Sequence, residues 1–437
     1  MMARIAYSLL LYLLTPLIWL RLLWRGRKQP EYLRNVGERY GFYGQRADSG
    51  ENRPILWVHA VSVGETRAAQ PLIEALLARW PEHRLLLTGM TPTGRAAGRE
   101  VYAEACGERL IQAYLPYDYP AAVDRFLRHF SPAFGVLMET EIWPNLLAAA
   151  QRRGVPVMLV NARLSARSAR GYGKVGALVR PAFAALAGTA AQTAEDAQRL
   201  GALGAVAVDV CGNLKFDVVP PADKLALGRD WRQAVGNRPV WLAASTREGE
   251  EPLILAAWRK LAVPGALLVL VPRHPQRFAE VAALLQREGV PFRRRSEGLP
   301  EAGDAVWLGD SMGELVAYYA LADLAFIGGS LLPLGGQNLI EAAACGCPVV
   351  IGPHTFNFQR ATEDAIAAGA ARRVGDVDAL ALAVDCLLGQ KSTGSEASGE
   401  TELAAMRAAS QAFAAAHRGA VGRTLALIAR TTGRAAR

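Results

Sequence analysis

The feature that most constrains this 437-residue sequence is a regular alternation of short apolar runs with longer amphipathic ones. Residues 55–63 (ILWVHAVSV) and 83–90 (HRLLLTGM) are largely apolar, whereas residues 66–80 place apolar side chains at helical spacing. The same alternation continues through apolar runs at 109–116, 133–140 and 156–162. Such a pattern predicts a parallel β-sheet with helices on both faces.

The alternation stops at residues 212–231, which contain turn residues, charges and two adjacent prolines, and then starts again. The later apolar runs are 239–246, 266–274, 304–310, 323–330 and 348–352. A chain of this length usually forms more than one hydrophobic core. We therefore predict an α/β protein with two doubly wound domains and a cleft between them. The expected domains are residues 29–215 and 216–415, and a helix over 416–437 either packs back on the first domain or stands apart from it.

The N-terminus carries an additional apolar segment. Residues 5–20 contain no charge, although Pro16 interrupts them, and they are followed by Arg21, Arg25, Arg27 and Lys28. Counting four residues further brings the run close to the length that a membrane-crossing helix needs. We predict an N-terminal membrane-anchor helix with a basic collar over residues 1–28, and the chain after it on the cytoplasmic side. The alternative is a helix that docks on the first domain.

The net charge of +9 suits an anionic membrane surface, a nucleic acid or a phosphorylated substrate. No Walker, HExxH or repeated CxxC motif occurs, and the DVD at residues 376–378 is a weak metal signal. We therefore expect arginines, backbone amides and helix N-termini to neutralise phosphate, without a metal or another cofactor.

Residues 328–358 contain the strongest binding motif of the second half. Glycines such as Gly329 let backbone amides approach an anion closely, and Asn338 is expected to start a helix whose N-terminus attracts phosphate. Glu341, one turn into that helix, is placed to bond ribose hydroxyls. The alternative is a tight turn and a capped helix that bind nothing.

Three other loops leave strand ends of the same predicted sheet. Because the carboxyl ends of parallel strands meet at one edge, we expect these loops to form a single nucleotide and phosphate site. Their candidate residues are Ser245, Thr246, Arg273, His274, Gly309, Met312 and Gly313. Ser245 and Thr246 are also ordinary helix caps, which is the alternative for those two residues.

The first half supplies acids at its predicted strand ends. Glu65 follows Ser62 and Gly64, which leave room beside it, and Glu139 and Glu141 follow another strand. Each glutamate either caps the next helix or takes part in chemistry. The segment after the next strand carries basic residues that form either a solvated loop or a polyanion site. They are Arg163, Arg167, Arg170 and Lys174.

Together, several of these motifs resemble the 3-deoxy-D-manno-oct-2-ulosonic acid (Kdo) transferase family of lipopolysaccharide synthesis. The motifs are HAVSVGE, METEIWPN, NARLS, STREGEE, PRHPQRF, GDSMGEL and GGSLLPLGGQNLIEAAACGCPVV, in that order along the chain. The resemblance implies a GT-B glycosyltransferase fold of two Rossmann-like domains. It also implies a CMP-Kdo donor, a lipid A precursor (lipid IVA) as acceptor, inversion without a metal, and a place at the cytoplasmic face of the inner membrane, among its lipids.

The resemblance also implies roles for individual residues. Glu65 matches the family's general base, which inversion in one displacement requires, and Glu141, with Glu139, orients the acceptor or the base. Arg273, the amides near Gly313 and the helix near Asn338 stabilise the departing CMP, and Glu341 holds its ribose. Arg163 and its basic neighbours meet acceptor phosphates or the Kdo carboxylate.

Three other functions fit parts of the sequence. A GT-B enzyme with a UDP-sugar donor and a lipid acceptor is the nearest alternative. A sugar-nucleotide epimerase shares the expected architecture but needs no membrane anchor. A membrane-tethered nucleotide or nucleic-acid binder would explain the basic charge but not three acids at strand ends, so we expect no nucleic acid partner. The sequence identifies no obligate protein partner.

Overall fold

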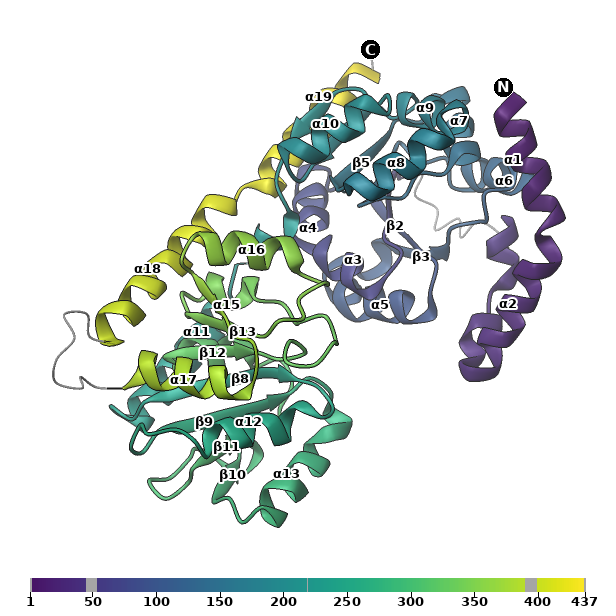
Figure 1. The fold of residues 1–437 in the computed structure, drawn as a ribbon. Coiled ribbons are helices and arrows are strands. Elements are labelled where there is room, and N and C mark those ends of the chain that lie inside the picture. Colours follow the sequence, from purple (N-terminus) through teal and green to yellow (C-terminus); the bar gives the residue numbers. More distant parts are fainter. Residues whose placement is uncertain (1, 45–52, 218, 390–398, 436–437) are drawn as a thin grey trace. The chain divides into compact units, whose positions relative to one another are not determined.

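The computed structural model describes residues 2–44, 53–217, 219–389 and 399–435 (Figure 1). The chain divides into two compact units. Unit 1 comprises Met1–Asp217 with Gly419–Arg437, and unit 2 comprises Val218–Arg418. Each unit contains one seven-stranded sheet in which all neighbouring strands are parallel. The prediction of two parallel-sheet α/β domains is confirmed.

The sheet of unit 1 has the strand order β3-β2-β1-β4-β5-β6-β7. The strand order reverses at β1, which lies between β2 and β4, and such a switch point opens a crevice at the carboxyl ends of the strands. The strands are β1 Ile55–His59, β2 Arg84–Gly89, β3 Leu110–Tyr114, β4 Phe134–Met138, β5 Val157–Ala162, β6 Gly188–Ala191 and β7 Val208–Val210.

Helices pack on both faces of this sheet. Side chains alternate along β1, so that Trp57 joins one buried cluster while Leu56 and Val58 join another. The single helix predicted over residues 66–80 is in fact two, because the chain breaks at Ala69 and restarts with Pro71 in the first turn. The helices are α3 Val63–Ala68, α4 Gln70–Arg79, α5 Pro92–Cys106, α6 Pro120–Phe130, α7 Pro144–Arg152, α8 Ala166–Lys174, α9 Gly176–Ala184, α10 Ala194–Ala202 and α19 Ala420–Ala435.

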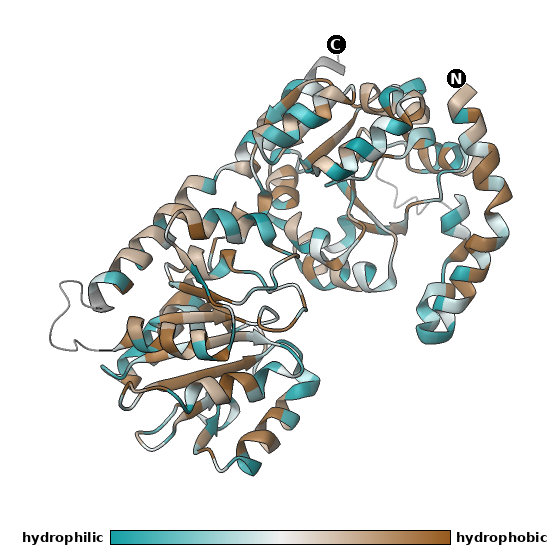
Figure 2. Cartoon of the chain, viewed as in Figure 1, coloured by the Kyte–Doolittle hydropathy of each residue, from teal (hydrophilic) through white to brown (hydrophobic). Residues whose placement is uncertain are grey.

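Unit 2 repeats this architecture with the strand order β10-β11-β9-β8-β12-β13-β14, and its order reverses at β8. The long strands of both sheets are coloured hydrophobic over most of their length (Figure 2). The strands are β8 Val240–Thr246, β9 Leu267–Pro272, β10 Phe292–Arg294, β11 Val306–Leu308, β12 Leu324–Ile327, β13 Val349–Ile351 and β14 Ala371–Arg373. The helices are α11 Ala222–Val235, α12 Glu250–Trp258, α13 Phe278–Arg287, α14 Leu315–Leu321, α15 Ile340–Ala344, α16 Gln359–Ala367, α17 Val377–Leu388 and α18 Gly399–His417.

The N-terminal apolar segment forms two helices rather than the single predicted one. They are α1 Met2–Leu13 and α2 Thr15–Lys28, which meet at a bend of 50°. Pro16 lies in the first turn of α2, where its ring is tolerated but cannot continue the preceding helix. In the described ranges no helix is by itself long and apolar enough to cross a membrane, and the bent pair meets that length and composition only when taken together.

The polarity of α1 is the reverse of that in a soluble amphipathic helix. Its large apolar side chains are exposed, Leu9 by 64% and Leu13 by 76%. Its polar Ser8 is buried instead, where the Ser8 Oγ lies 3.0 Å from Asn145 Nδ2. At the start of α2, the Thr15 and Tyr119 hydroxyls lie 2.8 Å apart. The polar face of this segment therefore packs on unit 1, and its apolar face points outward.

Candidate active site

Glu65 lies in the first turn of α3, just after β1. Ser62 is the N-cap of this helix, and its Oγ accepts the Glu65 N–H at 3.3 Å. The Glu65 carboxylate reaches back, so that Oε2 accepts the Val61 N–H at 2.8 Å and Oε1 lies 3.2 Å from the Ser62 Oγ. These contacts form a reciprocal cap, which means that the capping alternative describes the observed geometry.

Capping does not use the whole Glu65 carboxylate. The side chain remains partly exposed, and a Cβ at neighbouring Gly64 would approach only the Ser62 Oγ, at 3.8 Å. Burial raises the pKa of Glu65, the hydrogen bond from Val61 opposes that shift, and the charge of Glu139 adds to it. A carboxylate with a raised pKa and open surface beside it is a stronger base than an exposed glutamate and is suited to accept a proton.

Glu139 follows β4 in a left-handed backbone conformation, with φ of +56°. Its Oε2 accepts a hydrogen bond from Arg163 Nε at 3.0 Å and lies 3.0 Å from Arg163 Nη2, and its Oε1 lies 3.8 Å from the Lys215 ammonium. Asn161, at the end of the neighbouring strand β5, also has a positive φ, of +51°. Two strained residues at adjacent strand ends are typical of functional sites.

Glu141 is the third acid of this group. Its Oε2 accepts the indole N–H of Trp143 at 2.9 Å and lies 4.0 Å from Nε2 of His59. Burial raises the pKa of Glu141 to about 7, with a further contribution from the charge of Glu65. We call Glu65, Glu139 and Glu141 the carboxylate cluster.

His59 supports the carboxylate cluster as a neutral group. It is fully buried at the end of β1, and burial lowers its pKa to about 3. Its Nδ1 lies 3.0 Å from the Thr88 Oγ1, while its Nε2 has no hydrogen-bond partner. The 4.0 Å contact with Glu141 is therefore not an ion pair. His59, Trp143 and Lys215 were missed by the sequence analysis, although His59 is the only polar side chain in an otherwise apolar strand.

The basic segment after β5 is divided by the structure. Arg163 joins the carboxylate cluster through Glu139. Arg167, Arg170 and Lys174 lie on α8, where their side chains are exposed. None of these three makes an ion pair or a side-chain hydrogen bond with another described residue. A shared anion site for these four residues stays a prediction.

In unit 2, the loop after β8 is held by two buried glutamates. Glu250 accepts backbone N–H groups from Arg247 at 2.9 Å, Gly329 at 2.5 Å and Leu331 at 3.1 Å. Glu251 accepts the Thr246 hydroxyl at 2.7 Å. These bonds connect the loop after β8 to the loop after β12, residues 328–339, which we call the glycine loop. The sequence analysis missed both glutamates, because nothing in their spacing indicates that they face inward.

Ser245 and Thr246 do not cap α12, so the capping alternative for them is wrong. The N-cap of that helix is Gly249, and the Thr246 hydroxyl donates to Glu251 instead. Ser245 has a φ of +57° at the end of β8. A Cβ on Gly328 would come within 2.6 Å of the Ser245 carbonyl oxygen, so only glycine permits this close approach.

Asn338 lies before α15 rather than at its start, because the helix begins at Ile340 and has only five residues. The predicted helix start at Asn338 is therefore wrong. The Asn338 Oδ1 accepts the Ile340 N–H at 3.1 Å, and its Nδ2 donates to Glu341 Oε1 at 3.0 Å. Asn338 thus fixes the first turn and orients Glu341.

Arginines gather at the ends of β8 and β9. Arg273 follows β9, and its backbone N–H donates to the Thr246 carbonyl oxygen at 3.0 Å. The exposed His274 has a lowered pKa, first through partial burial and then through the charges of Arg247, Arg273 and Arg277. Arg277 itself pairs with Glu251 at 2.6 Å. The strand ends therefore present an electropositive surface next to the glycine loop.

The loop after β11 provides the remaining predicted donor residues. Gly309 is buried, and a Cβ there would lie 2.7 Å from Val271 Cγ2. Met312 is exposed, and Gly313 has a φ of +76°. Neighbouring Asp310 accepts both the backbone N–H and the hydroxyl of Ser296. Asp310 is thus bonded within the protein. Met312 and Gly313 lie at the surface.

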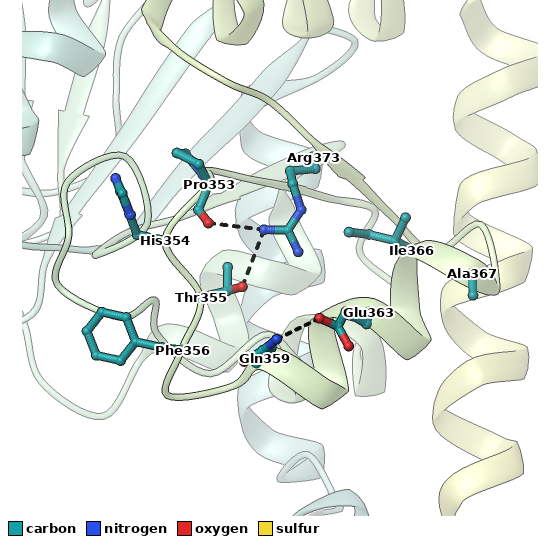
Figure 3. Close-up of a pocket in the computed structure, with 9 residues that line it drawn as sticks. All are labelled: Pro353, His354, Thr355, Phe356, Gln359, Glu363, Ile366, Ala367 and Arg373. Carbon is teal, nitrogen blue, oxygen red and sulfur yellow. Dashed lines mark hydrogen bonds between the residues drawn. The ribbon is translucent and has the colours of Figure 1, made fainter. Parts of the chain in front are cut away.

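A cavity of about 710 Å³ adjoins the glycine loop (Figure 3). The Arg373 Nη1 donates to the Pro353 carbonyl oxygen at 3.2 Å and to Thr355 Oγ1 at 3.4 Å. The same segment contacts the glycine loop, since the Asn357 N–H donates to the Gly335 carbonyl oxygen at 2.9 Å. The lining residues are Pro353, His354, Thr355, Phe356, Gln359, Glu363, Ile366, Ala367 and Arg373. The sequence analysis did not predict this cavity, which requires β13, β14 and α16 together.

Within the described part of the chain, no three His, Cys, Asp or Glu side chains gather as a group that could hold a metal ion. The side chains of the carboxylate cluster bond to the Val61 N–H, to Trp143, and to Arg163 and Lys215.

Comparison with known proteins points to one family. Residues 34–218 match the family described as 3-deoxy-D-manno-octulosonic-acid transferase (kdotransferase). A 3-deoxy-D-manno-octulosonic acid transferase of Bordetella pertussis is 49% identical, over 97% of this chain and 98% of the relative. One of Haemophilus influenzae is 39% identical, over 90% and 92%. A glycosyltransferase structure from Rickettsia africae, 14% identical, matches 87% of this chain and 99% of its own with a TM-score of 0.55, which supports the fold alone.

Proposed function

The chain belongs to the 3-deoxy-D-manno-octulosonic acid transferase family and is a glycosyltransferase, and from this premise we propose that it transfers Kdo from CMP-Kdo to lipid IVA in lipopolysaccharide synthesis. The observation that carries the proposal is the carboxylate cluster of unit 1, in which Glu65 combines partial exposure with a raised pKa. The cationic strand ends of unit 2 supply the complementary chemistry.

Glu65 is the proposed general base. As the acceptor hydroxyl attacks the anomeric carbon of Kdo, Glu65 takes its proton, the bond from that carbon to the CMP oxygen breaks, and CMP leaves with the electron pair. Attack opposite the leaving group inverts the anomeric centre. The raised pKa makes Glu65 a stronger base than an exposed glutamate, and such a group typically contributes about 100- to 10,000-fold to the rate.

Glu141 and Glu139 support that base in different ways. Glu141, with a pKa of about 7, is partly protonated near neutral pH, so the ionised form of Glu65 meets less repulsion. Glu139 stays paired with Arg163, which keeps it in place to orient the acceptor or Glu65. Arg167 and Lys174 are exposed and remain candidates for acceptor phosphates.

We assign donor binding to unit 2. Arg273 and the backbone amides around Gly313 and Gly329 would neutralise the phosphate of the departing CMP, so no metal is required. Ser245, Thr246, His274, Gly309 and Met312 shape the same loops. Glu341, which Asn338 orients through the hydrogen bond to Oε1, is the residue that we assign to the ribose.

We propose that α1 and α2 attach the enzyme to the cytoplasmic face of the inner membrane. The apolar side chains of α1 point outward, and basic residues end α2. Arg21, Arg25, Arg27 and Lys28 would face anionic headgroups, as in other membrane-surface segments. This attachment would keep unit 1 beside an acceptor that stays in the bilayer.

The nucleotide released tests the proposal. The full-length protein would be incubated with lipid IVA and either CMP-Kdo or a UDP-sugar, and free nucleotide measured with and without acceptor. Acceptor-dependent release of CMP supports the proposal. Release of UDP but not CMP would instead identify a transferase that uses a UDP-sugar.

A further inference from the structure

Unit 1 also contains a cavity, which lies between the N-terminal helix α1 and the body of the unit. It has a volume of about 290 Å³ and is formed by α1, the first residue of α6, and α7. Its lining residues are Arg4, Ile5, Ser8, Leu9, Pro120, Asn145 and Arg152. None of them belongs to the carboxylate cluster or to the predicted donor loops.

The polar floor of this cavity is internally bonded. The buried Asn145 donates from Nδ2 to Ser8 Oγ at 3.0 Å and to the Asp118 carbonyl oxygen at 2.7 Å. The Asp118 carboxylate accepts the backbone N–H groups of Asn145 at 2.9 Å and Leu146 at 2.8 Å. The floor therefore has fixed geometry, and its acid is already occupied by backbone donors.

Two guanidinium groups meet at the same cavity without partners. The side chains of Arg4 and Arg152 make no hydrogen bond or ion pair with any residue of the described ranges. The acids whose charges act on them are Asp118 and Asp124, and Asp124 is already paired with Arg153 and Arg128. Two unpaired like charges at one cavity repel each other unless an anion lies between them.

The rim of the cavity is apolar and continues the outward face of α1. Ile5 is 50% exposed and Leu9 is 64% exposed, although both line the cavity. A ligand that fits this arrangement has an anionic head for the arginines and a hydrocarbon part for the rim. Phosphate suits arginine because the planar guanidinium bonds two of its oxygens at once.

We propose that this cavity binds the phosphate headgroup of an anionic glycerophospholipid, whose acyl chains lie along Ile5 and Leu9. The proposal rests on the membrane attachment given above and adds a specific lipid contact to it. The lipid would orient α1 on the membrane, and the bonds of Ser8 and Asn145 would transmit that orientation to α7.

The test measures binding of the full-length protein to phosphatidylcholine vesicles with and without phosphatidylglycerol. The site variant is Arg4→Gln with Arg152→Gln. The matched control is Arg99→Gln with Arg229→Gln, two exposed arginines that make no ion pair within the described residues and whose loss changes the net charge equally. We expect phosphatidylglycerol-dependent affinity to fall about tenfold or more in the site variant, since the charge-assisted bonds to the headgroup phosphate are lost, and to change little in the control.

A second pair of variants and a soluble ligand keep the test decisive. If the glutamine pair lowers the unfolding midpoint, Arg4→Lys with Arg152→Lys keeps the charge but loses the planar fork, and binding should still weaken. Dihexanoylphosphatidylglycerol and inorganic phosphate, titrated separately below the micelle concentration, distinguish a lipid site from a phosphate site. The lipid should bind, and the site variant should lose that binding.

Two outcomes would overturn the proposal. They are an equal loss of affinity in the site and control variants, and equally tight binding of inorganic phosphate and the short-chain lipid. Equal wild-type binding to both vesicle types would also reject the headgroup site but leave membrane attachment intact. Only a wild-type protein that binds neither vesicle would reject the attachment itself.

Discussion

Glu65 of unit 1 and Glu250 of unit 2 occupy matching positions in the two sheets. Each follows the first strand of its unit, at the point where the strand order reverses, and each lies in the first turn of a helix. Both side chains reach back to a backbone N–H, of Val61 and of Arg247 respectively. Burial raises the pKa of both.

The difference lies in how many donors each carboxylate accepts. Glu250 is fully buried and accepts three backbone N–H groups that come from two separate loops. Glu65 accepts one backbone N–H and one hydroxyl and remains partly exposed. A carboxylate saturated by backbone donors holds structure, whereas one with free lone pairs at the surface is available for proton transfer.

The surroundings strengthen this contrast. The neighbours of Glu65 include Glu139 and Glu141, so negative charge accumulates and one more proton is readily taken up. The neighbour of Glu250 is Glu251, which pairs with Arg277 at 2.6 Å. The same local motif therefore gives a saturated, structural carboxylate in unit 2 and, in unit 1, the partly exposed carboxylate that we propose as the general base.

The largest expected effect on stability is that of Glu250→Ala. The change leaves three backbone N–H groups buried without acceptors, and each costs about 1–3 kcal/mol. We expect the free energy of unfolding of unit 2 to fall by at least about 3 kcal/mol, together with loss of CMP binding. Denaturant unfolding and CMP titration measure both. The exposed neighbour Glu248→Ala is the control, and equal stability of the two variants would contradict the structural role.

A smaller effect is expected for the pH dependence of stability. Because the folded protein raises the pKa of Glu141 from 4.5 to about 7, it binds a proton more tightly than the unfolded chain does. The free energy of unfolding should therefore fall as pH rises between these values and level off above them. Glu141→Gln should flatten this slope, and Glu65 should account for part of what remains. The slope measured by urea unfolding should not change in the exposed control Glu104→Gln.

The smallest effect separates backbone strain from charge at Glu139. Its φ of +56° costs a residue with a Cβ about 1 kcal/mol, which glycine avoids. Both Glu139→Gly and Glu139→Ala lose the pair with Arg163, so their difference reports the backbone alone. We expect the glycine variant to be more stable by about 1 kcal/mol, although both should transfer Kdo slowly. A glycine variant that unfolds more easily than the alanine variant would show that the strain has been misassigned.

The sequence predicted the long central strands of both sheets, because they are short apolar runs without the helical spacing of the segments between them. It missed β6, β7, β10 and β14, whose residues (GTAA, VDV, FRR and ARR) are small or charged and only three or four long. β7, β10 and β14 are edge strands, which pair on one side and need less apolar surface, whereas β6 lies between β5 and β7 but has only four small residues, so periodicity detects none of them. The prediction of one N-terminal helix was also wrong, because a bend near Pro16 divides the apolar run into α1 and α2.

For the site, the sequence predicts which loops meet at the edge of each sheet. The positions of Glu65, Glu139 and Glu141 follow from the strand ends, and their proximity appears in the mutual effects on their pKa values. The pairing of Arg163 with Glu139, and its separation from Arg167, depends on where α8 begins. Which glutamates face inward, as Glu250 and Glu251 do, depends on tertiary packing that no local pattern records.

The most direct test of the account is the rate of CMP release from CMP-Kdo with lipid IVA in the wild type, in Glu65→Gln and in the surface control Glu104→Gln. The rate should fall about 100- to 10,000-fold in Glu65→Gln, with CMP affinity and unfolding midpoint unchanged, and should not fall in the control. A folded Glu65→Gln variant that releases CMP at the wild-type rate would contradict the account and leave Glu65 as a helix cap.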